Sequence, residues 1–443
     1  MTLVSGWGRF PVVDTDLRRP RSLAAVGEAI AGLAGAVARG NGRAYGDAAI
    51  GAARTVAMTG FDRVRSFDPA TGRIRLEAGL LLSDLIDTFG PRGFLPFVVP
   101  GTQFVSIGGA IAADVHGKNH HCEGGFGRYV DSILLRTGQG EVIEASREQN
   151  SDAFFATVGG MGLTGVILEA TMRLRPVETG WIRERVISAS DLDAAMRALE
   201  ASDSATYSVA WIDCAARGRD LGRSLIYLGE HARADELAGG AGAFPAGRNP
   251  ALAVPVDLPS MTLNRYSIRA FNELYCRMGA RRSGGNHVVS LYPYFFPLDS
   301  IADWNRIYGR RGFLQHQCVI PEQGARDVLG DILGRVARRG DASFLAVLKK
   351  LGQGDGILSF PLPGYTLALD FPVKGDILKF LDEIDRLVVA AGGRLYLAKD
   401  ARQSRATFEA GYPALSRFNA IRKSLDPAGN IRSKLSQRLF DEV

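Results

Sequence analysis

The sequence predicts an α+β protein of two domains, and three observations lead to this expectation. Its 443 residues are enough for more than one domain with a core of its own. As far as about residue 177, short strands alternate with turns rich in glycine. From about residue 180, strands of alternating apolar and polar residues are separated by amphipathic helices, a pattern typical of an antiparallel sheet covered by helices.

The elements of the first part can be read in chain order. Ser22 is a suitable N-cap for an amphipathic helix over 22–34, and "GAVARG" (35–40) then reads as a short strand that ends at a glycine-rich turn. The segment "RSFDPATGRIRLEAG" (65–79) predicts a hairpin that turns at Pro69 to Gly72. Ser83 is expected to cap the next helix, and "GVILEATMRLRP" (165–176) is expected to close this part as a strand.

The second part begins with a helix over 190–199 and contains a longer one that starts at Asp376 and ends at Gly392. The segment 231–265 is rich in glycine, alanine and proline, and we expect a loop there. The apolar run "LYPYFFPLD" (291–299) fits either a core strand or an exposed loop that meets a polyprenyl tail or a membrane surface. Alternating strands are expected at 205–213, 286–296, 312–320, 343–350 and 364–373.

Composition limits the class of protein. The 53 basic residues against 47 acidic ones give a net charge of +6, which favours anionic partners, but no basic helix suggests nucleic-acid binding. The four cysteines are isolated, which fits a reducing compartment rather than a disulfide framework. Without a signal-like apolar start or an 18-residue apolar run, we expect a protein of the cytoplasm or of the inner membrane face, with no membrane span.

Two glycine-rich segments resemble dinucleotide-binding turns but lack the helix that such turns require. "ARGNGRAYGD" (38–47) is followed by residues with little helical periodicity, and "GMGLTG" (160–165) is followed by a strand. Bare backbone N–H groups can nevertheless bind a pyrophosphate without a Rossmann helix. The segment 38–47 therefore remains either such a site or an ordinary turn.

The stretch "SIGGAIAADVHGKNHHCEGGFG" (106–127) combines histidines with very small residues. Small side chains allow a large planar or phosphate-bearing ligand to approach the backbone closely. A metal site is not expected, because His120 and His121 are adjacent and Gly117 interrupts any helix that would join them to His116. His116 is the candidate for ligand contact, and we expect the other two histidines to be structural.

Together, "ARGNGRAYGD", "VPGTQFVSIGGAIAADVHGKNHH" (99–121) and "TVGGMGLTGVI" (157–167) resemble the FAD-binding domain of the vanillyl-alcohol oxidase family. The resemblance implies two packed α+β subdomains that bury FAD. The histidine that tethers the flavin in many relatives is missing at Gly42-Arg43-Ala44, so non-covalent FAD is implied. The implied FAD contacts are Arg39, Gly40, Asn41, Gly42, Arg43, Ala44 and Tyr45 in the first loop, Gly101, Ser106, Gly108, Gly109, Ala113, His116 and Gly117 in the second, and Ile167 and Tyr396.

Further motifs resemble a narrower group in that family, the decaprenylphosphoryl-β-D-ribose 2′-oxidases. They are "HGKNHH", "DWNRIYG" (303–309), "GFLQHQCVIP" (312–321), "SFPLPGY" (359–365), "DFPVK" (370–374) and "RLYLAKDAR" (394–402). The resemblance implies an FAD-binding domain at 1–177, a substrate domain at 178–393 and a return to the FAD-binding domain at 394–443. Ala368 departs from the cysteine that the familiar mycobacterial members carry there, so no thiol is expected beside the flavin.

Two residue patterns in the expected substrate domain also fit a site for a sugar and a flavin. Gln315 and Gln317 share one face of a strand, where sugar hydroxyls are suitable partners for buried amides. Thr366, Ala368 and Asp370 share a small or polar face that is able to meet the flavin, while the alternate residues are apolar.

The implied roles follow. Lys399 is the expected base or orienting group for the substrate hydroxyl, and His116 and Tyr45 are expected to position the ring. The expected contacts to the sugar and its phosphate are Gln315, Gln317, Asn305, Arg306, Lys349, Lys118 and Thr366.

The implied reaction is FAD-dependent oxidation of the 2′-hydroxyl of a polyprenyl-phospho-β-D-ribose to the 2′-keto sugar. A separate nicotinamide-dependent reductase would then complete an epimerisation to the arabinose form, and oxygen or a quinone would reoxidise the flavin. Two alternatives remain open at this point. One is a soluble sugar or alditol oxidase on the same scaffold, and the other is a non-catalytic flavin-binding protein of a cell-envelope complex.

Overall fold

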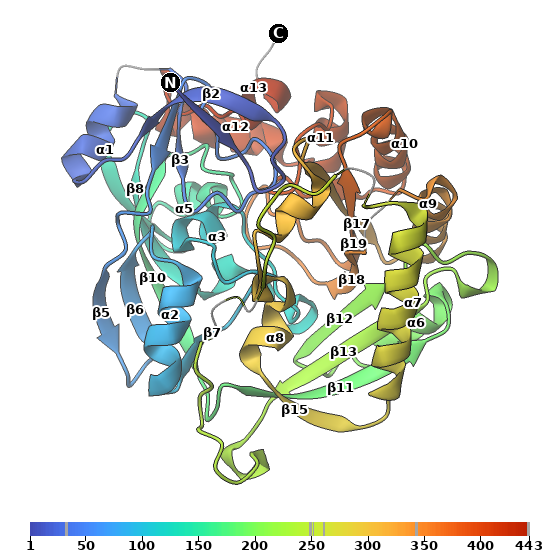
Figure 1. The fold of residues 1–443 in the computed structure, drawn as a ribbon. Helices are drawn as coiled ribbons and strands as arrows, with labels where there is room; N and C mark the ends of the chain where they lie inside the picture. Colours follow the sequence, from blue (N-terminus) through green and yellow to red (C-terminus); the bar gives the residue numbers. More distant parts are fainter. Residues whose placement is uncertain (32–33, 248–249, 251, 260–261, 342–343, 441–443) are drawn as a thin grey trace.

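The first part of the chain forms two packed sheets (Figure 1). The computed structural model describes residues 1–31, 34–247, 250, 252–259, 262–341 and 344–440. The smaller sheet has the order β1-β2-β4-β3 and carries helix α1 (Leu23–Ile30), with Ser22 as its N-cap as predicted; Leu33 lies outside the described residues. Its strands are β1 (Thr2–Ser5), β2 (Val12–Arg18), β3 (Ala36–Arg39) and β4 (Arg54–Ala57).

The second sheet of this part is antiparallel, in the order β5-β6-β10-β8-β9, with β7 also paired to β10. The predicted hairpin is present as β5 and β6, and the predicted strand at 165–176 is β10. The strands are β5 (Val64–Asp68), β6 (Arg73–Glu77), β7 (Phe94–Pro96), β8 (Val130–Arg136), β9 (Val142–Ser146) and β10 (Val166–Pro176), accompanied by helices α2 (Leu82–Phe89), α3 (Ile107–Ala112), α4 (His120–Glu123) and α5 (Ser151–Thr157).

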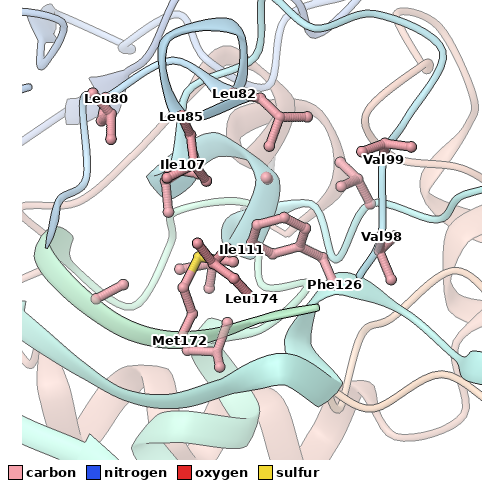
Figure 2. Packing of buried hydrophobic residues seen from close by; sticks show 14 of the residues in the cluster. Leu80, Leu82, Leu85, Val98, Val99, Ile107, Ile111, Phe126, Met172 and Leu174 are labelled. Carbon is pink, nitrogen blue, oxygen red and sulfur yellow. The ribbon is translucent and has the colours of Figure 1, made fainter. Parts of the chain in front are cut away.

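An apolar core fixes α3 against this second sheet. The helix contributes Ile107, Ala110 and Ile111 to the core, so its small residues are left on the opposite side. Side chains from β10, α2 and the segment before α3 fill the same core. Figure 2 labels ten of these residues: Leu80, Leu82, Leu85, Val98, Val99, Ile107, Ile111, Phe126, Met172 and Leu174.

The second part is built on an antiparallel sheet of eight strands in the described chain, in the order β15-β11-β13-β12-β18-β19-β17-β20. Helices α6 (Leu192–Glu200), α9 (Ala325–Arg339) and α10 (Ile377–Ala390) cover one face, and α7 (Arg265–Arg281) packs on the other. The strands are β11 (Trp181–Ala189), β12 (Tyr207–Ile212), β13 (Ser224–His231), β15 (Asn286–Ser290), β17 (Phe313–Pro321), β18 (Ala346–Leu351), β19 (Gly364–Pro372) and β20 (Arg394–Leu395).

The α+β class is therefore confirmed, with an antiparallel sheet and covering helices in the second part. After β20, helix α11 (Arg405–Gly411) packs on β20 and α10, and the chain then returns to the first part through α12 (Leu415–Leu425), which packs on α5, and α13 (Lys434–Leu439). Bridges pair Ile431 with Ala36 and Ser433 with Gly51. The domain boundaries at 177 and 393 remain predictions.

Two local predictions are wrong. The strand expected over 286–296 ends at Ser290, and Leu291–Phe295 form helix α8, because Pro293 has no N–H for a strand ladder but fits a first helical turn. This run is buried, so it belongs to the core and not to an exposed loop. Ser83 lies inside α2 rather than capping it, since backbone carbonyls of Gln103 and Val105 accept the first N–H groups of the helix.

The predicted loop over 231–265 has little regular structure in its described residues. It holds a short 3₁₀ turn (Ala234–Glu236) and the two-residue strand β14 (Leu252–Ala253), which pairs with β16 (Ile301–Ala302). The five positions 248, 249, 251, 260 and 261 of this segment lie outside the described residues, as does position 343 at the start of another predicted strand.

Candidate active site

The first glycine loop and the start of α3 lie against each other. A Cβ on Gly40 would lie 2.0 Å from Ser106 Oγ, so only glycine allows this approach. The Asn41 amide donates to the Phe104 carbonyl at 2.9 Å, which fixes the two segments together. The Arg43 guanidinium stacks on Trp7, 4.0 Å from the ring centroid, and its Nε atom is buried without a partner among the described residues.

The small residues of the second segment form a bare surface. Ser106 caps α3 by accepting from the Gly109 N–H at 3.3 Å. Gly101 and Gly109 are exposed, and Ala113 is partly so, although the segment around them is largely buried. Such a surface fits a flat cofactor, because its side chains are very small and leave room for a ring system close to the backbone.

His116 is the buried polar group at the end of this surface. Its Nε2 lies 3.0 Å from the Gln317 Nε2, and the same amide nitrogen donates to Thr366 Oγ1 at 3.2 Å. An amide N–H can only donate, so His116 Nε2 accepts and Nδ1 carries the proton. Burial lowers the pKa of His116 well below its ordinary value, and nearby lysine charges lower it further. The Nδ1–H has no partner among the described residues, so it is available to a ligand.

Tyr396 holds the C-terminal return to this histidine. Its ring centroid lies 5.1 Å from that of His116, and its hydroxyl donates to the Ala113 carbonyl at 2.9 Å. Its backbone N–H donates to the Gln317 carbonyl at 2.9 Å. The predicted residues of the second loop, the sheet and the return therefore meet at His116 and Tyr396.

A second polar cluster lies along the same strand pair. Gln315 lies opposite Asp370 in the register of β17 and β19, and its amide donates to that carboxylate at 2.6 Å. The Tyr308 hydroxyl donates to the other carboxylate oxygen at 3.2 Å. Burial raises the pKa of Asp370. The sequence placed Asp370 on the polar face of its strand, but it did not predict that Gln315 and Tyr308 are the partners of this carboxylate.

Lys399 reaches this cluster from the C-terminal return. Its Nζ lies 3.6 Å from the centroid of the Tyr45 ring, a cation–π contact with the first loop. Burial lowers the pKa of Lys399, and the negative charge of Asp370 opposes that effect. Burial also raises the pKa of Tyr45 well above its ordinary value, so its hydroxyl stays protonated. Lys399 is thus a buried amine close to His116 that has access to a neutral form.

Two more predicted lysines are buried nearby. Burial lowers the pKa of Lys118 to about 7, and its ammonium lies 4.1 Å from the Tyr294 ring centroid and donates to the Tyr294 carbonyl. Burial lowers the pKa of Lys349 to about 8. Lys349 lies opposite Thr366 in the register of β18 and β19, so it shares the face of the His116 cluster. Three amines with few acidic neighbours make this region suitable for an anionic ligand.

Asn305 and Arg306 lie on a short 3₁₀ helix, η6 (Trp304–Tyr308), beside a polar cleft of about 360 Å³. The Asn305 amide donates to the Trp7 carbonyl at 3.0 Å, so it supports the N-terminal segment. Arg306 lies 3.5 Å from Asp257, which also pairs with Arg9. The structure therefore places these two predicted substrate contacts at the cleft, and not in the Gln317 cluster.

The remaining histidines of the region have structural partners. His120 Nδ1 accepts from the Gly352 N–H at 3.0 Å, and His121 Nε2 lies 2.9 Å from the Ala205 carbonyl oxygen. His316 points to the other face of β17 and pairs with Asp385 at 3.0 Å. The described residues contain no group of three or more histidine, cysteine or acidic side chains placed to hold a metal ion.

Comparisons with known proteins identify the family. Residues 19–146 match the model described as FAD binding domain, and residues 368–439 match that described as D-arabinono-1,4-lactone oxidase. Decaprenylphosphoryl-beta-D-ribose oxidase of Mycolicibacterium smegmatis is 38% identical over 98% of this chain and 96% of its own. The chain belongs to the vanillyl-alcohol-oxidase-type family of FAD-binding oxidases.

Two further proteins are similar over most of the chain. An uncharacterized protein of Streptomyces coelicolor is 34% identical over 81% of this chain and 100% of its own. L-gulonolactone oxidase of Mus musculus is 23% identical over 90% of this chain and 88% of its own. As a member of this family the protein uses FAD, and it is an oxidoreductase that acts on CH–OH groups of the sugar or lactone type.

The residues present fit FAD. Gly40 and Ser106 approach closely, so no large side chain fills the space between the two loops. The buried Arg43 Nε and His116 Nδ1 have no hydrogen-bond partner among the described residues and are available to the cofactor. Ile167 is buried on β10, in the apolar core of that sheet. In the described part of the chain, no helix combines the length and apolarity that a bilayer crossing requires.

Proposed function

We propose that this protein oxidises the 2′-hydroxyl of a polyprenyl-phospho-β-D-ribose to the 2′-keto sugar. The observation that carries the proposal is the convergence of Lys399, the Gln315–Asp370 pair and the Gln317–His116 pair beside the bare surface of α3. Similarity along almost the whole chain to the relative of that name in Mycolicibacterium smegmatis supports the choice of substrate. A nicotinamide-dependent reductase would consume the keto product and complete an epimerisation.

The two glycine loops would hold FAD without a covalent bond, and the flavin would supply the acceptor for the hydride of C2′. Neutral Lys399 Nζ accepts the proton of the 2′-hydroxyl as the hydride leaves. Because burial lowers the pKa of Lys399, the neutral amine is present at a lower pH than for an exposed lysine. Tyr45 holds the amine in place through its ring and cannot compete as a base, since its own pKa is raised.

The amides of Gln315 and Gln317 orient the sugar. The Gln315 nitrogen donates to Asp370, and the Gln317 nitrogen donates to His116 and Thr366, which leaves the amide oxygens to accept from sugar hydroxyls. Thr366 fixes the Gln317 amide, and the free His116 Nδ1–H is a donor toward the bound ring system. Lys349 and Lys118 neutralise the phosphate on this face, while Arg306 and Asn305 line the neighbouring cleft.

A second candidate is oxidation of a free sugar or aldonolactone. The match of residues 368–439 to the D-arabinono-1,4-lactone oxidase model favours it, as does the likeness to L-gulonolactone oxidase. It differs from the first candidate because it requires neither the phosphate nor the prenyl group.

Anaerobic reduction of the bound flavin separates the candidates. The protein is mixed without oxygen with prenyl-phospho-ribose, free ribose, arabinitol or arabinono-1,4-lactone, and the flavin absorbance is followed. We expect bleaching by prenyl-phospho-ribose alone. Rapid bleaching by the lactone or by arabinitol, with none by prenyl-phospho-ribose, would contradict the proposed substrate and favour the second candidate.

A further inference from the structure

Helix α7 carries an unusual number of exposed apolar side chains. Tyr266 is 67% exposed, Phe271 44%, Leu274 59% and Met278 57%. Single exposed apolar residues are normal on a protein surface, but a group of them on one helix marks an interaction surface. We call the outward side of α7 with Leu274, Met278 and its arginines the α7 face.

The inner side of α7 is firmly attached, so the exposure is not due to a loosely packed helix. The Asn272 amide donates to buried Asp213 at 2.6 Å, and the Tyr275 ring centroid lies 4.7 Å from that of Trp211. A Cβ on Gly279 would lie 2.1 Å from Leu225, which shows how closely helix and sheet approach. Figure 1 shows α7 crossing in front of strands β11, β12 and β13.

Charge on the α7 face selects its partner. Arg277 and Arg281 lie three and seven residues after Leu274, on the same side of the helix. Both are exposed. Arg277 pairs at 2.7 Å with Glu273, the one acidic residue of the helix, and Glu273 also pairs with Arg223, so the arginines of this side still outnumber its acidic groups. A second copy of the chain would bring arginines against arginines, whereas an anionic lipid surface complements both the charge and the apolar side chains.

Helix α7 packs on the same face of the sheet as the proposed sugar site. Gln317 lies opposite Ala368 in the register, Ala368 opposite Val347, and Val347 opposite Trp211. Directly paired residues share a face of the sheet, so this row joins the His116 cluster to the strand on which α7 packs. Four neighbouring strands place Gln317 and Trp211 roughly 14 Å apart.

We propose that the α7 face docks the protein on an anionic lipid bilayer, with the sugar site directed toward substrates held in that bilayer. Docking through the α7 face is argued from that face alone. The direction of the sugar site rests on the proposed function, because a long polyprenyl chain keeps its phospho-sugar at a membrane surface. Apolar side chains of α7 would enter the headgroup region while Arg277 and Arg281 contact lipid phosphates.

Vesicle co-sedimentation of the FAD-loaded full chain tests the docking. Vesicles of phosphatidylcholine and phosphatidylglycerol in equal parts are compared with vesicles of phosphatidylcholine alone. The test variants are the pair Leu274→Glu with Met278→Glu, and the pair Arg277→Glu with Arg281→Glu. Leu3→Glu is the matched control, because Leu3 is 74% exposed on β1, in the other part of the molecule.

We expect the natural protein and Leu3→Glu to bind the anionic vesicles, and each α7 pair to bind about tenfold or more weakly. Equal binding by both α7 pairs, or no vesicle binding by the natural protein, would overturn the docking proposal. Self-association or capture of another protein through α7, without vesicle binding, would overturn it as well.

Oxidation of a water-soluble short-prenyl phospho-ribose separates the two proposals. We expect the same rate of flavin bleaching in all four proteins, because the substituted side chains point away from the sheet. If none of them oxidises this substrate, the proposed function fails while the vesicle result still stands. If only the α7 variants lose this activity, the helix has an internal role and the docking proposal is wrong.

Discussion

The close approach of Gly40 to Ser106 gives a quantitative test of the FAD cradle. In Gly40→Ala the new methyl group would lie 2.0 Å from Ser106 Oγ, about 1 Å inside the shortest contact that such atoms make. Either the Ser106 side chain leaves its capping position or the two loops move apart, and overpacking of this kind costs about 1–3 kcal/mol. If the loops bind FAD in their observed positions, the dissociation constant for FAD rises about 5–150-fold.

A compensating substitution makes the cause identifiable. Ser106→Gly removes both Oγ and Cβ, the two atoms within 4 Å of the new methyl group, so Gly40→Ala with Ser106→Gly should recover most of the FAD affinity. Ser106→Gly alone loses the cap on α3, which costs only a few tenths of a kcal/mol when glycine replaces it. Gly60→Ala is the control, because nothing lies within 4 Å of the position that its methyl group would take.

The assay is quenching of FAD fluorescence on titration with each FAD-free protein, together with thermal unfolding to detect general damage. Unchanged FAD affinity in Gly40→Ala would refute the assignment of this loop pair to the cofactor. A double variant as weak as Gly40→Ala would show that the effect does not come from the Ser106 contact.

Three further predictions concern the polar site. Lys399→Met should lower the rate of flavin reduction about 10²–10⁴-fold while FAD stays bound, as measured by stopped-flow absorbance across pH. The natural rate should rise with pH through the lowered pKa of Lys399, and the variant should lack this rise. Lys349→Met should stabilise the FAD-free protein at pH 6 by ~1–2 kcal/mol in urea unfolding, after allowance for partial exposure. Ala368→Cys should place a reactive thiol in the site, detectable by labelling and mass spectrometry and blocked by bound substrate.

The sign of the Lys349 effect follows from its pKa, lowered from 10.5 to about 8. Below pH 8 the folded protein holds a charged, buried amine that water stabilises better in the unfolded chain, so removing the amine raises the free energy of unfolding. Above about pH 10.5 the amine is neutral in both the folded and the unfolded state, and the substitution no longer stabilises the protein. A benefit that grew with pH would contradict this account.

Lys399→Arg tests the role of Lys399 as a base, because a guanidinium keeps the charge but cannot act as a proton acceptor. Full activity in that variant would exclude the base role. Exposed Cys122 is the labelling control for Ala368→Cys.

Local patterns predicted the strands and helices whose inner and outer faces differ in polarity. The helix over 376–392 is α10, and the alternation of β19 is confirmed, with Leu367 and Leu369 in the core and Ala368 on the other side. Helix α7 was not predicted because its outward face mixes apolar and basic side chains, which weakens the contrast with its inner face. Helix α9 was not predicted either, because Gly330 and Gly334 in its interior lower its helix propensity.

The site itself was only partly predictable. The shared face of Gln315 and Gln317 follows from strand geometry, but their partners come from distant segments: His116 is 201 positions away from Gln317. Sequence alone also could not show that Asn305 supports Trp7, since that contact spans 298 positions. The resemblance to a family supplied these residues as a group, and the structure supplies the contacts between them.

Those contacts explain why the C-terminal return is needed for the chemistry. Arg438 on α13 pairs with Asp47 and Asp400, each at 2.9 Å. Asp47 lies two residues after Tyr45, and Asp400 is the neighbour of Lys399, so one guanidinium fixes the spacing of the amine and the ring that holds it. Removing one partner of such a buried pair leaves an uncompensated charge, which is a larger loss than the pair itself contributes. The position of the proposed base therefore depends on the packing of the last helix against the first loop.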